Sequence, residues 1–410
     1  MKGSIKLDEV IKILKEESQE TKPIKNEKGN KIIGFETTEA FKIAERYLLE
    51  FGKLSDFITC AEYCAYYNII ELADTIAQKI IESKDPKSCY LLATIENFRT
   101  LKNYTAKIQQ IILDSKDYDL IFNFAKNYVY ADIKKCAKAI IESNLANVNY
   151  KFAKEFGRKC DITAHQKIVL DSKYPQLCLN FAKFVKGADI KALEKVCLEC
   201  KDAELCLDFV QNVKDADIKA HQQVIINEEN SKLAYKFSLI TGADVNALAN
   251  VAIKNKNAKV CFNFAKQFAD KVDLKAIEEI IIESKDSDLC YNFAIDIPGV
   301  NIKALEKVII EGNDPLMCYR FASKFKDADI KALEEVVLNN PGRINLLFAR
   351  DIKGADIKAH HKALVKCGNK DLIDDFNNFF PKYANEKNNN IILEKMQREI
   401  NQHNDKEMLM

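Results

Sequence analysis

Three cysteines lie close enough in the sequence to bind a metal ion or to carry out thiol redox chemistry. Cys197 and Cys200 form a Cys-x-x-Cys pair, and Cys206 follows six residues later. This spacing occurs in zinc sites and in redox motifs. A complete site needs more ligands, but no second pair at comparable spacing follows, and Cys197 occupies a position that is apolar in other copies of the repeat described below. The sequence therefore predicts no metal site and no cofactor.

Histidine is the other residue type here that could serve catalysis or metal binding. His165, His221 and His360 each stand four residues after an aspartate, where other copies of the repeat hold leucine or isoleucine. Because these histidines belong to repeats at least two apart, they cannot converge on one site, and we predict structural roles in or beside the core. The chain also lacks GxSxG, HExxH, Walker and glycine-rich nucleotide motifs. We expect no catalytic residues and no enzymatic activity.

Most of the chain repeats itself with a period of about 28 residues, and this repeat must position any functional group. A phenylalanine recurs at Phe124, Phe152, Phe181, Phe209, Phe237, Phe264, Phe293, Phe321 and Phe348. An aspartate or asparagine recurs with the same drift, at Asp132, Asp161, Asp189, Asp217, Asp244, Asp273, Asn301, Asp329 and Asp356. Weaker copies place Cys64, Leu92 and Phe376 at the phenylalanine position. Together they indicate about twelve repeats over residues 37–383.

Each repeat should contain two helices, because aspartate is a favoured N-cap and occurs twice per period. Asp189 is expected to open a first helix, the A helix, and Asp202 a second, the B helix. Glycines such as Gly187, which stand between a B helix and the next A helix, are expected at a C-terminal cap. Two short helices cannot bury their apolar faces alone. The sequence thus predicts an all-α fold, a right-handed α-solenoid of about twelve 28-residue helix-turn-helix repeats.

This organisation resembles the helical-hairpin solenoids, the class to which the tetratricopeptide and HEAT repeats belong. The resemblance covers residues 37–383 and concerns architecture only. A period of 28 residues is shorter than that of either repeat, and the Trp/Gly/Pro pattern of the tetratricopeptide repeat is absent. The resemblance implies stacked helix pairs and points to no particular family.

Two columns of B-helix side chains should face away from the core, namely the residues one before and two after the central phenylalanine. They predict a binding surface of amide and basic residues: Asn123, Lys126, Lys151, Lys154, Asn180, Lys183, Asn263, Lys266, Asn292, Arg320 and Arg350. The alternative is an ordinary solvated face. On the A helices, lysines alternate with Glu194, Glu278, Glu306 and Glu334, and we expect that face to be charge-balanced and solubilising only.

The composition argues against several functional classes. Sixty-two basic residues against sixty-one acidic ones leave a net charge of +1, so no global field attracts nucleic acid or an anionic membrane. The sequence contains no apolar stretch of the length that spans a bilayer, and residues 1–20 lack the apolar centre of a signal peptide. Six of the thirteen cysteines stand three residues before the central phenylalanine or leucine, which suggests buried, reduced thiols. We expect a cytoplasmic protein without membrane contact.

Two segments flank the predicted array of residues 37–383. Residues 1–36 contain a charged helical stretch and the sequence NEKGNKIIGF, which suits either a small hairpin or a loop. Residues 384–410 read as a polar tail with one short amphipathic helix. Either segment could carry an interaction that the array does not.

Two functions stay open at the level of the sequence. The first is a non-enzymatic scaffold that binds a protein or peptide along a concave B-helix surface, since solenoids commonly bind partners there. The second is binding of single-stranded nucleic acid, because helical repeats can read bases with Asn, Gln and Arg and bind phosphates with Lys. Aromatic residues before the asparagine column alternate with leucines, which suits packing better than base stacking. We favour the protein or peptide partner.

Overall fold

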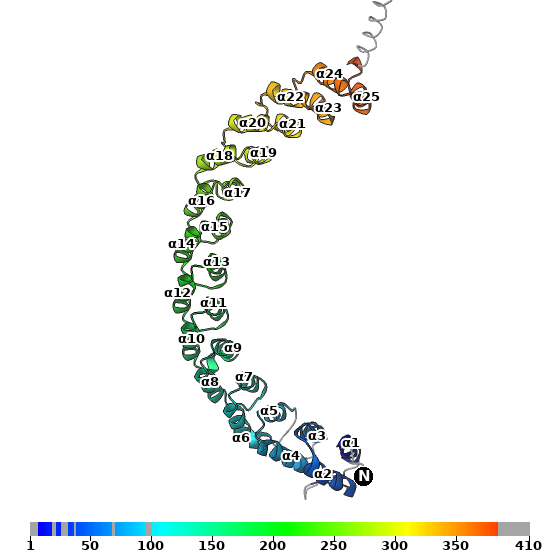
Figure 1. Ribbon diagram of the computed structural model, residues 1–410, viewed down its shortest axis with the longest axis vertical. Coiled ribbons are helices and arrows are strands. Elements are labelled where there is room, and N and C mark those ends of the chain that lie inside the picture. The colour runs from blue at the N-terminus through cyan, green and yellow to red at the C-terminus, as the bar shows by residue number, and fades with distance from the viewer. Residues whose placement is uncertain are drawn as a thin grey trace, which may run out of the picture. The chain divides into compact units, whose positions relative to one another are not determined.

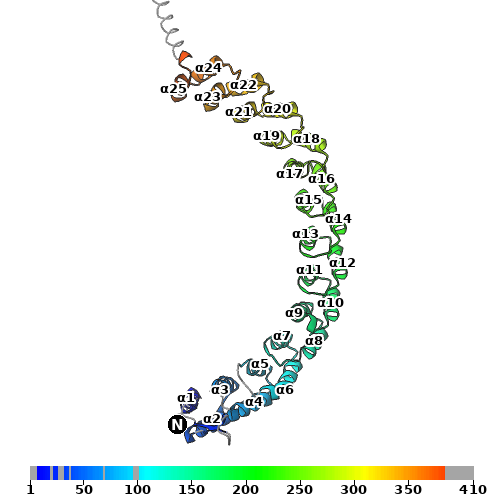
Figure 2. The same cartoon turned by 180° about the vertical axis from the view of Figure 1, so that it is seen from behind.

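A computed structural model describes residues 7–18, 22–25, 32–36, 38–67, 70–95 and 101–383 of the 410-residue chain. Within these residues the helices follow one another in twelve A/B pairs, from α2/α3 to α24/α25. Within each half of the chain, the A helices form one row and the B helices form a second row beside it (Figures 1 and 2). The predicted all-α solenoid is confirmed, whereas its right-handedness stays a prediction.

The chain forms two compact halves, residues 1–216 and 217–410. The N-terminal half opens with α1 (Leu7–Ser18) and with a two-stranded antiparallel hairpin of β1 (Lys22–Lys25) and β2 (Ile32–Glu36). The boundary between the halves falls inside the predicted repeat array, so the division into 1–36, 37–383 and 384–410 stays a prediction. Residues 384–410, where a tail helix was expected, lie outside the described residues.

In the N-terminal half, the A helices are α2 (Glu39–Phe51), α4 (Ile70–Glu82), α6 (Leu101–Asp114), α8 (Ile133–Glu142), α10 (Ile162–Asp171) and α12 (Ile190–Glu199). The B helices are α3 (Leu54–Tyr67), α5 (Pro86–Thr94), α7 (Tyr118–Asn127), α9 (Ala146–Phe156), α11 (Pro175–Phe184) and α13 (Ala203–Asn212). A 3₁₀ helix, η1 (Gly157–Lys159), follows α9. Helices this short are marginal in isolation, so packing between repeats must stabilise them.

In the C-terminal half, the A helices are α14 (Ile218–Asn227), α16 (Val245–Lys254), α18 (Leu274–Glu283), α20 (Ile302–Glu311), α22 (Ile330–Asn339) and α24 (Ile357–Cys367). The B helices are α15 (Ser231–Ser238), α17 (Ala258–Phe268), α19 (Ser287–Asp296), α21 (Pro315–Lys324), α23 (Arg343–Asp351) and α25 (Lys370–Phe379). These helices have 8 to 11 residues, like those from α7 to α13, whereas α2, α3, α4 and α6 have 13 or 14.

The predicted N-caps are confirmed. Asp189 precedes α12 and its carboxylate accepts a hydrogen bond from the Ala192 N–H at 3.2 Å. Asp202 precedes α13 and accepts from the Leu205 N–H at 2.9 Å. Each contact satisfies one of the N–H groups that the first helical turn leaves without a partner.

The predicted glycine caps need correction. Helix α11 ends at Val185, whose N–H donates to the Phe181 carbonyl. Gly187 lies two residues later, at a φ of 89°, in a turn that the Ala188 N–H closes on the Val185 carbonyl at 3.4 Å. Gly187 thus takes the left-handed position of the connecting turn and not the helix cap, whereas Gly157 does cap α9 and Gly368 caps α24.

The left-handed residues that do end A helices are mostly lysines. In nine of the twelve repeats, the connection from the A helix to its B helix contains a non-glycine residue at a φ of 48° to 56°, namely Lys84, Lys116, Asn144, Lys173, Lys201, Glu229, Lys256, Lys285 and Asn313. Left-handed backbone costs a residue with a Cβ atom about 1 kcal/mol, so each of these nine repeats carries a small local strain at this turn.

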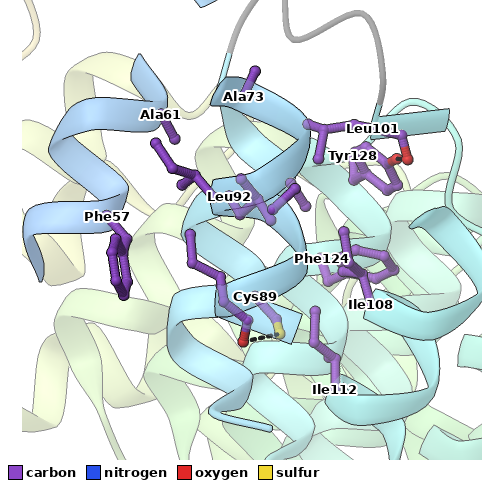
Figure 3. Packing of buried hydrophobic residues seen from close by; sticks show 14 of the residues in the cluster. Phe57, Ala61, Ala73, Cys89, Leu92, Leu101, Ile108, Ile112, Phe124 and Tyr128 are labelled. Carbon is purple, nitrogen blue, oxygen red and sulfur yellow. Dashed lines mark hydrogen bonds between the residues drawn. The ribbon is translucent and has the colours of Figure 1, made fainter. Parts of the chain in front are cut away.

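The central phenylalanines form the core. Phe124, Phe152, Phe181, Phe209, Phe237, Phe264, Phe293, Phe321, Phe348 and Phe376 are all fully buried. Figure 3 shows the packing around one of them, Phe124, near Ile108 and Ile112 of α6 and Leu92 of α5. Neighbouring repeats thus share apolar clusters that extend over several repeats, such as the cluster from Val10 to Phe152, which explains why no repeat needs a core of its own.

The recurring cysteines are buried beside this layer. The Cys89 thiol points to the Ile80 carbonyl at 4.0 Å (Figure 3), and the Cys290 thiol points to the Ile281 carbonyl at 3.5 Å. In both cases the carbonyl lies near the end of the A helix of the same repeat, where carbonyls lose their helical partners. A small apolar side chain with a weak S–H donor suits this position. None of the thirteen cysteines is in a disulfide.

Candidate functional site

The predicted binding surface does face outward. We call the residues one before, two after and three after the central phenylalanine the B-helix surface. Asn123, Lys126, Lys151, Lys154, Asn263, Lys266, Asn292, Arg320 and Arg350 are exposed, whereas Asn180 and Lys183 are half-buried. The helical-wheel prediction of their orientation is therefore correct, while their role in binding stays a prediction.

Acidic neighbours neutralise several of the basic residues on this surface. Lys126 Nζ lies 3.1 Å from Glu155, and Lys266 Nζ lies 2.8 Å from Asp296. In both pairs the acid belongs to the next B helix, three residues after its central phenylalanine. Further ion pairs join Lys151 to Asp119, Lys183 to Asp208 and Arg350 to Asp351. The column three residues after the central phenylalanine, which supplies Glu155, Asp296 and Asp351, was left out of the sequence prediction, so the surface is less basic than the sequence suggested.

Aromatic rings replace the acid at two positions of the same column. Lys154 Nζ lies 4.3 Å from the centre of the Phe184 ring, and the Arg350 guanidinium lies 5.5 Å from the centre of the Phe379 ring. Both rings are about half exposed. A cation over an aromatic face gains about 0.5–1 kcal/mol at an exposed site. The basic residues thus contribute to contacts between neighbouring repeats.

The asparagines of the B-helix surface differ from the lysines. The side-chain amides of Asn123, Asn180, Asn263 and Asn292 make no hydrogen bond to any described residue. Each amide keeps an acceptor oxygen and a two-proton donor nitrogen. Asn263 and Asn292 stand at the same position of neighbouring helices, α17 and α19. They are therefore the polar groups of this surface that are available to a partner.

The cysteine motif does not form a reactive site. Cys197 and Cys206 are buried, and burial raises the pKa of Cys206 to about 12 and that of Cys197 further. The exposed Cys200 directs its thiol to the Cys197 carbonyl at 2.9 Å. Thiolates are the nucleophiles and metal ligands, so burial and raised pKa values leave Cys197 and Cys206 unreactive in the folded chain. In the described part of the chain, no three His, Cys, Asp or Glu side chains are placed to share a metal ion.

The histidines lie in the core, and two of them pair with asparagine. His165 is fully buried and its Nδ1 lies 2.7 Å from Asn149 Oδ1. His360 is also buried, with Nδ1 3.1 Å from Asn345 Nδ2. Burial lowers the pKa of both histidines to about 4, so both are neutral at pH 7.

Each of these asparagines occupies the place of the recurring cysteine. Asn149 Nδ2 donates to the Ile140 carbonyl at 2.9 Å, as Cys89 and Cys290 do in their repeats. The exchange of Cys for Asn on the B helix therefore accompanies the exchange of Leu for His on the next A helix. In the sequence the two columns change together at His165 and His360, whereas the B helix before His221 keeps Cys206.

The glutamates of the A helices are not merely solubilising, and that prediction is wrong. Glu194, Glu306 and Glu334 are buried. Glu306 Oε1 accepts a hydrogen bond from the backbone N–H of Asp329, the N-cap of the next A helix, at 2.6 Å. Gln166 makes a double contact of the same kind, accepting from the Asp189 N–H at 2.8 Å and donating to its carbonyl at 2.9 Å.

We call such a side chain a bracing residue, since it joins one A helix to the start of the next. The bracing residues are Gln109, Gln166, Gln222, Glu278, Glu306 and Glu334. Each precedes the capping residue it contacts by 22 or 23 residues. The signal was a column that holds Gln or Glu in most repeats, but a helical wheel for one helix cannot reveal a bond to the next repeat.

Comparisons with known proteins leave the family open. No protein-family model and no curated protein matches the chain. Among solved structures, the chain is similar to a "Circular tandem repeat protein with novel repeat topology and enhanced subunit contact surfaces", with 12% sequence identity, coverage of 87% of this chain and 74% of that chain, and a TM-score of 0.14. A likeness of this degree assigns no function. None of the helices in the described residues is long and apolar enough to cross a bilayer.

Proposed function

We propose that the protein is a non-enzymatic scaffold whose B-helix surface binds a protein or peptide partner in an extended conformation. The observation that carries the proposal is the set of free amides at Asn123, Asn180, Asn263 and Asn292, on a surface whose basic residues are largely paired. A side-chain amide offers one acceptor and a donor group, which complement the C=O and N–H of a peptide backbone.

The spacing of the helices supports this mode of binding. Packed helices lie about 8–10 Å apart, and an extended chain advances about 3.3 Å per residue. A peptide that crosses α17 and α19 would therefore meet Asn263 and then Asn292 about three residues later. Ile295 and Leu239 are exposed beside these helices and would contact apolar side chains of the peptide.

The paired lysines weigh against the alternative of a single-stranded nucleic acid. A phosphate that binds Lys126 or Lys266 must displace Glu155 or Asp296. Binding driven by counterion release depends on cations that are free to meet phosphates. The observed pairing therefore favours the peptide partner.

The test is a selection from a displayed library of random peptides, followed by fluorescence anisotropy with the selected peptides. We expect the double variant Asn263→Ala/Asn292→Ala to lower the affinity at least about tenfold, which corresponds to the loss of roughly one hydrogen bond at each position. The matched control is Lys195→Ala/Lys307→Ala, which changes two exposed A-helix lysines outside the surface. No selectable peptide, or equal losses in both variants, would refute the proposal.

A second experiment measures the binding of a single-stranded RNA of about 20 nucleotides, made of roughly five copies of an arbitrary tetranucleotide. We expect negligible RNA binding both for the unmodified chain and for the variant in which Lys126, Lys154, Lys183, Lys266 and Arg350 become Gln. Measurable RNA affinity in the unmodified chain, with a salt slope that falls by about 0.7 per lost contact in the variant, would establish the alternative.

A further inference from the structure

Between α8 and α22, two A helices have alanine at the bracing position. The position five residues after the capping residue holds Ala137 in α8 and Ala249 in α16, whereas α10, α12, α14, α18, α20 and α22 hold Gln or Glu there. The connection to the next A helix is also longer at both places. Asp161 follows Phe152 by nine residues and Asp273 follows Phe264 by nine, whereas Asp189 follows Phe181 by eight. An extra residue in the connection and the loss of the brace thus occur together.

At the junction of α8 with α10, the missing side chain leaves an opening. A cavity of about 530 Å³ lies there, with Ala137 and Ile141 of α8 on one side and Cys160 on the other. Asp161 caps α10 by accepting from the Ala164 N–H at 3.1 Å. Unlike the braced caps, the Asp161 N–H has no partner among the described residues. A Gln or Glu at position 137 would extend into this space.

Four basic side chains surround the cavity: Lys134, Lys138, Arg158 and Lys159. Arg158 and Lys159 belong to η1, the segment that contains the extra residue. Lys138 lies 3.9 Å from Glu142 on the same helix, and both side chains are highly exposed. The other three cations make no ion pair with any described residue. Two acidic side chains, Glu142 and Asp161, also line the cavity, so its four basic side chains leave a net charge of +2.

We infer that the cavity between α8 and η1 is a binding site for a small organic dianion, a phosphate or dicarboxylate group attached to an apolar body. Its anionic oxygens would take the place of the absent brace oxygen, as the Glu306 carboxylate does at its own junction, and would face Lys134, Arg158 and Lys159. The apolar body would lie against Ala137 and Ile141. Insertions into a repeat are where binding groups are often found.

The junction of α16 with α18 is the internal control. It shares the alanine, Ala249, and the longer connection, but its charges differ. Lys254 is paired with Glu229, and the connection carries Asp270 beside Lys271. A ligand that required only a missing brace would bind both junctions. A ligand that requires the cations should bind only the junction of α8 with α10.

The experiment is isothermal titration calorimetry of the full chain with phenyl phosphate and with phthalate at constant ionic strength. We expect saturable one-to-one binding of at least one of the two, and a comparison of the two shows whether the preferred head group is a phosphate or a dicarboxylate. Ala137→Gln, which supplies the missing side chain, and Arg158→Gln/Lys159→Gln, which removes two exposed cations, should each lower the affinity at least about tenfold. Ala249→Gln should leave the affinity unchanged.

Melting temperatures of the variants verify folding, and the Arg158→Gln/Lys159→Gln variant changes only exposed side chains. Three results would overturn the inference: no binding of either probe at about ten-millimolar concentration, which lies beyond the range of specific small-molecule sites; equal losses for Ala137→Gln and Ala249→Gln; or full affinity without Arg158 and Lys159. Because the site lies on the A-helix side, the outcome is independent of peptide binding to the B-helix surface.

Discussion

Two successive junctions between A helices are built from the same repeated unit but differ in one contact. The junction of α10 with α12 is closed by a buried side chain, whereas the junction of α8 with α10 is not. Gln166 makes two hydrogen bonds to the backbone of Asp189, whereas Ala137 makes none to Asp161. The helices, caps and central phenylalanines are the same at both places. The comparison teaches that an open junction differs from a braced one by the loss of one side chain together with one extra residue in the connection.

The largest expected effect comes from removing the brace. Gln166→Ala should lower the free energy of unfolding by about 2 kcal/mol, roughly one for each hydrogen bond, because the Asp189 N–H and carbonyl lose their partly buried partner. Urea unfolding followed by circular dichroism measures the change. Ala249→Gln, at an open junction, should alter stability by well under 1 kcal/mol, and a loss equal to that of Gln166→Ala would remove the distinction between the two kinds of junction.

The next prediction concerns how the free energy of unfolding depends on pH. The pKa of His165 and His360 is lowered to about 4 in the folded chain by burial, against about 6.5 in the unfolded chain. Below pH 6.5 the unfolded state binds protons that the folded state does not. Each histidine should therefore reduce the free energy of unfolding by up to about 1.4 kcal/mol per pH unit as the pH falls from 6.5 towards 4.

The control for this effect restores the more common residue pair. Asn149→Cys/His165→Leu should fold, since other repeats use Cys with Leu, and it should lose the pH dependence that His165 contributes. His165→Leu alone should be less stable than the double variant, because Asn149 Oδ1 is then buried without its partner. Unchanged pH dependence in the double variant would exclude His165 as its source.

A smaller effect concerns the turn inside a repeat, which is the same in most repeats whether or not the junction is braced. Lys201 has a φ of 55°, and Lys201→Gly should raise the free energy of unfolding by up to about 1 kcal/mol through relief of the left-handed strain. Thermal unfolding of Lys201→Gly and of Lys201→Ala separates the backbone effect from the loss of the side chain. A lower stability of the glycine variant would show that the strain is negligible.

The smallest effect distinguishes a carboxylate brace from an amide brace. Burial raises the pKa of Glu334, against the opposing hydrogen bond from the Asp356 N–H. A raised pKa in the folded state means that stability is lost as the pH rises through that pKa. Glu334→Gln should therefore stabilise the chain by less than about 1 kcal/mol at pH 7, with no difference below the ordinary glutamate pKa of about 4.3. A stabilisation that is independent of pH would point to a packing effect instead.

The sequence predicted those features that one repeat determines by itself. Asp189 and Asp202 cap their helices as expected because a cap depends on the next three residues. Phe181 is buried as expected because helical periodicity marks the apolar face. The outward direction of Asn263 followed from the same periodicity. These predictions use only local spacing, and the repeat supplied many copies with which to check them.

The features that were missed or misjudged depend on contacts between repeats. Glu306 looked like a surface charge because its neighbour on the helix is Lys303, but the Asp329 N–H holds its carboxylate in a buried place. Lys126 looked free because its partner, Glu155, lies on the next helix. Gly187 was assigned to a helix cap because the length of the connecting turn was unknown. Each of these contacts spans a distance that helical periodicity does not describe.

The buried cysteines have a practical consequence for following local opening in solution. Cys89, Cys178, Cys206, Cys261, Cys290 and Cys318 are fully buried, one in each of six B helices, and burial raises the pKa of their thiols. A thiol in this state reacts with an alkylating reagent only when its repeat opens. Mass spectrometry of pulse-alkylated peptides would therefore give an opening rate for each repeat, with the exposed Cys200 and Cys367 as the fast reference. The chain contains, in effect, its own series of chemical reporters from one end of the array towards the other.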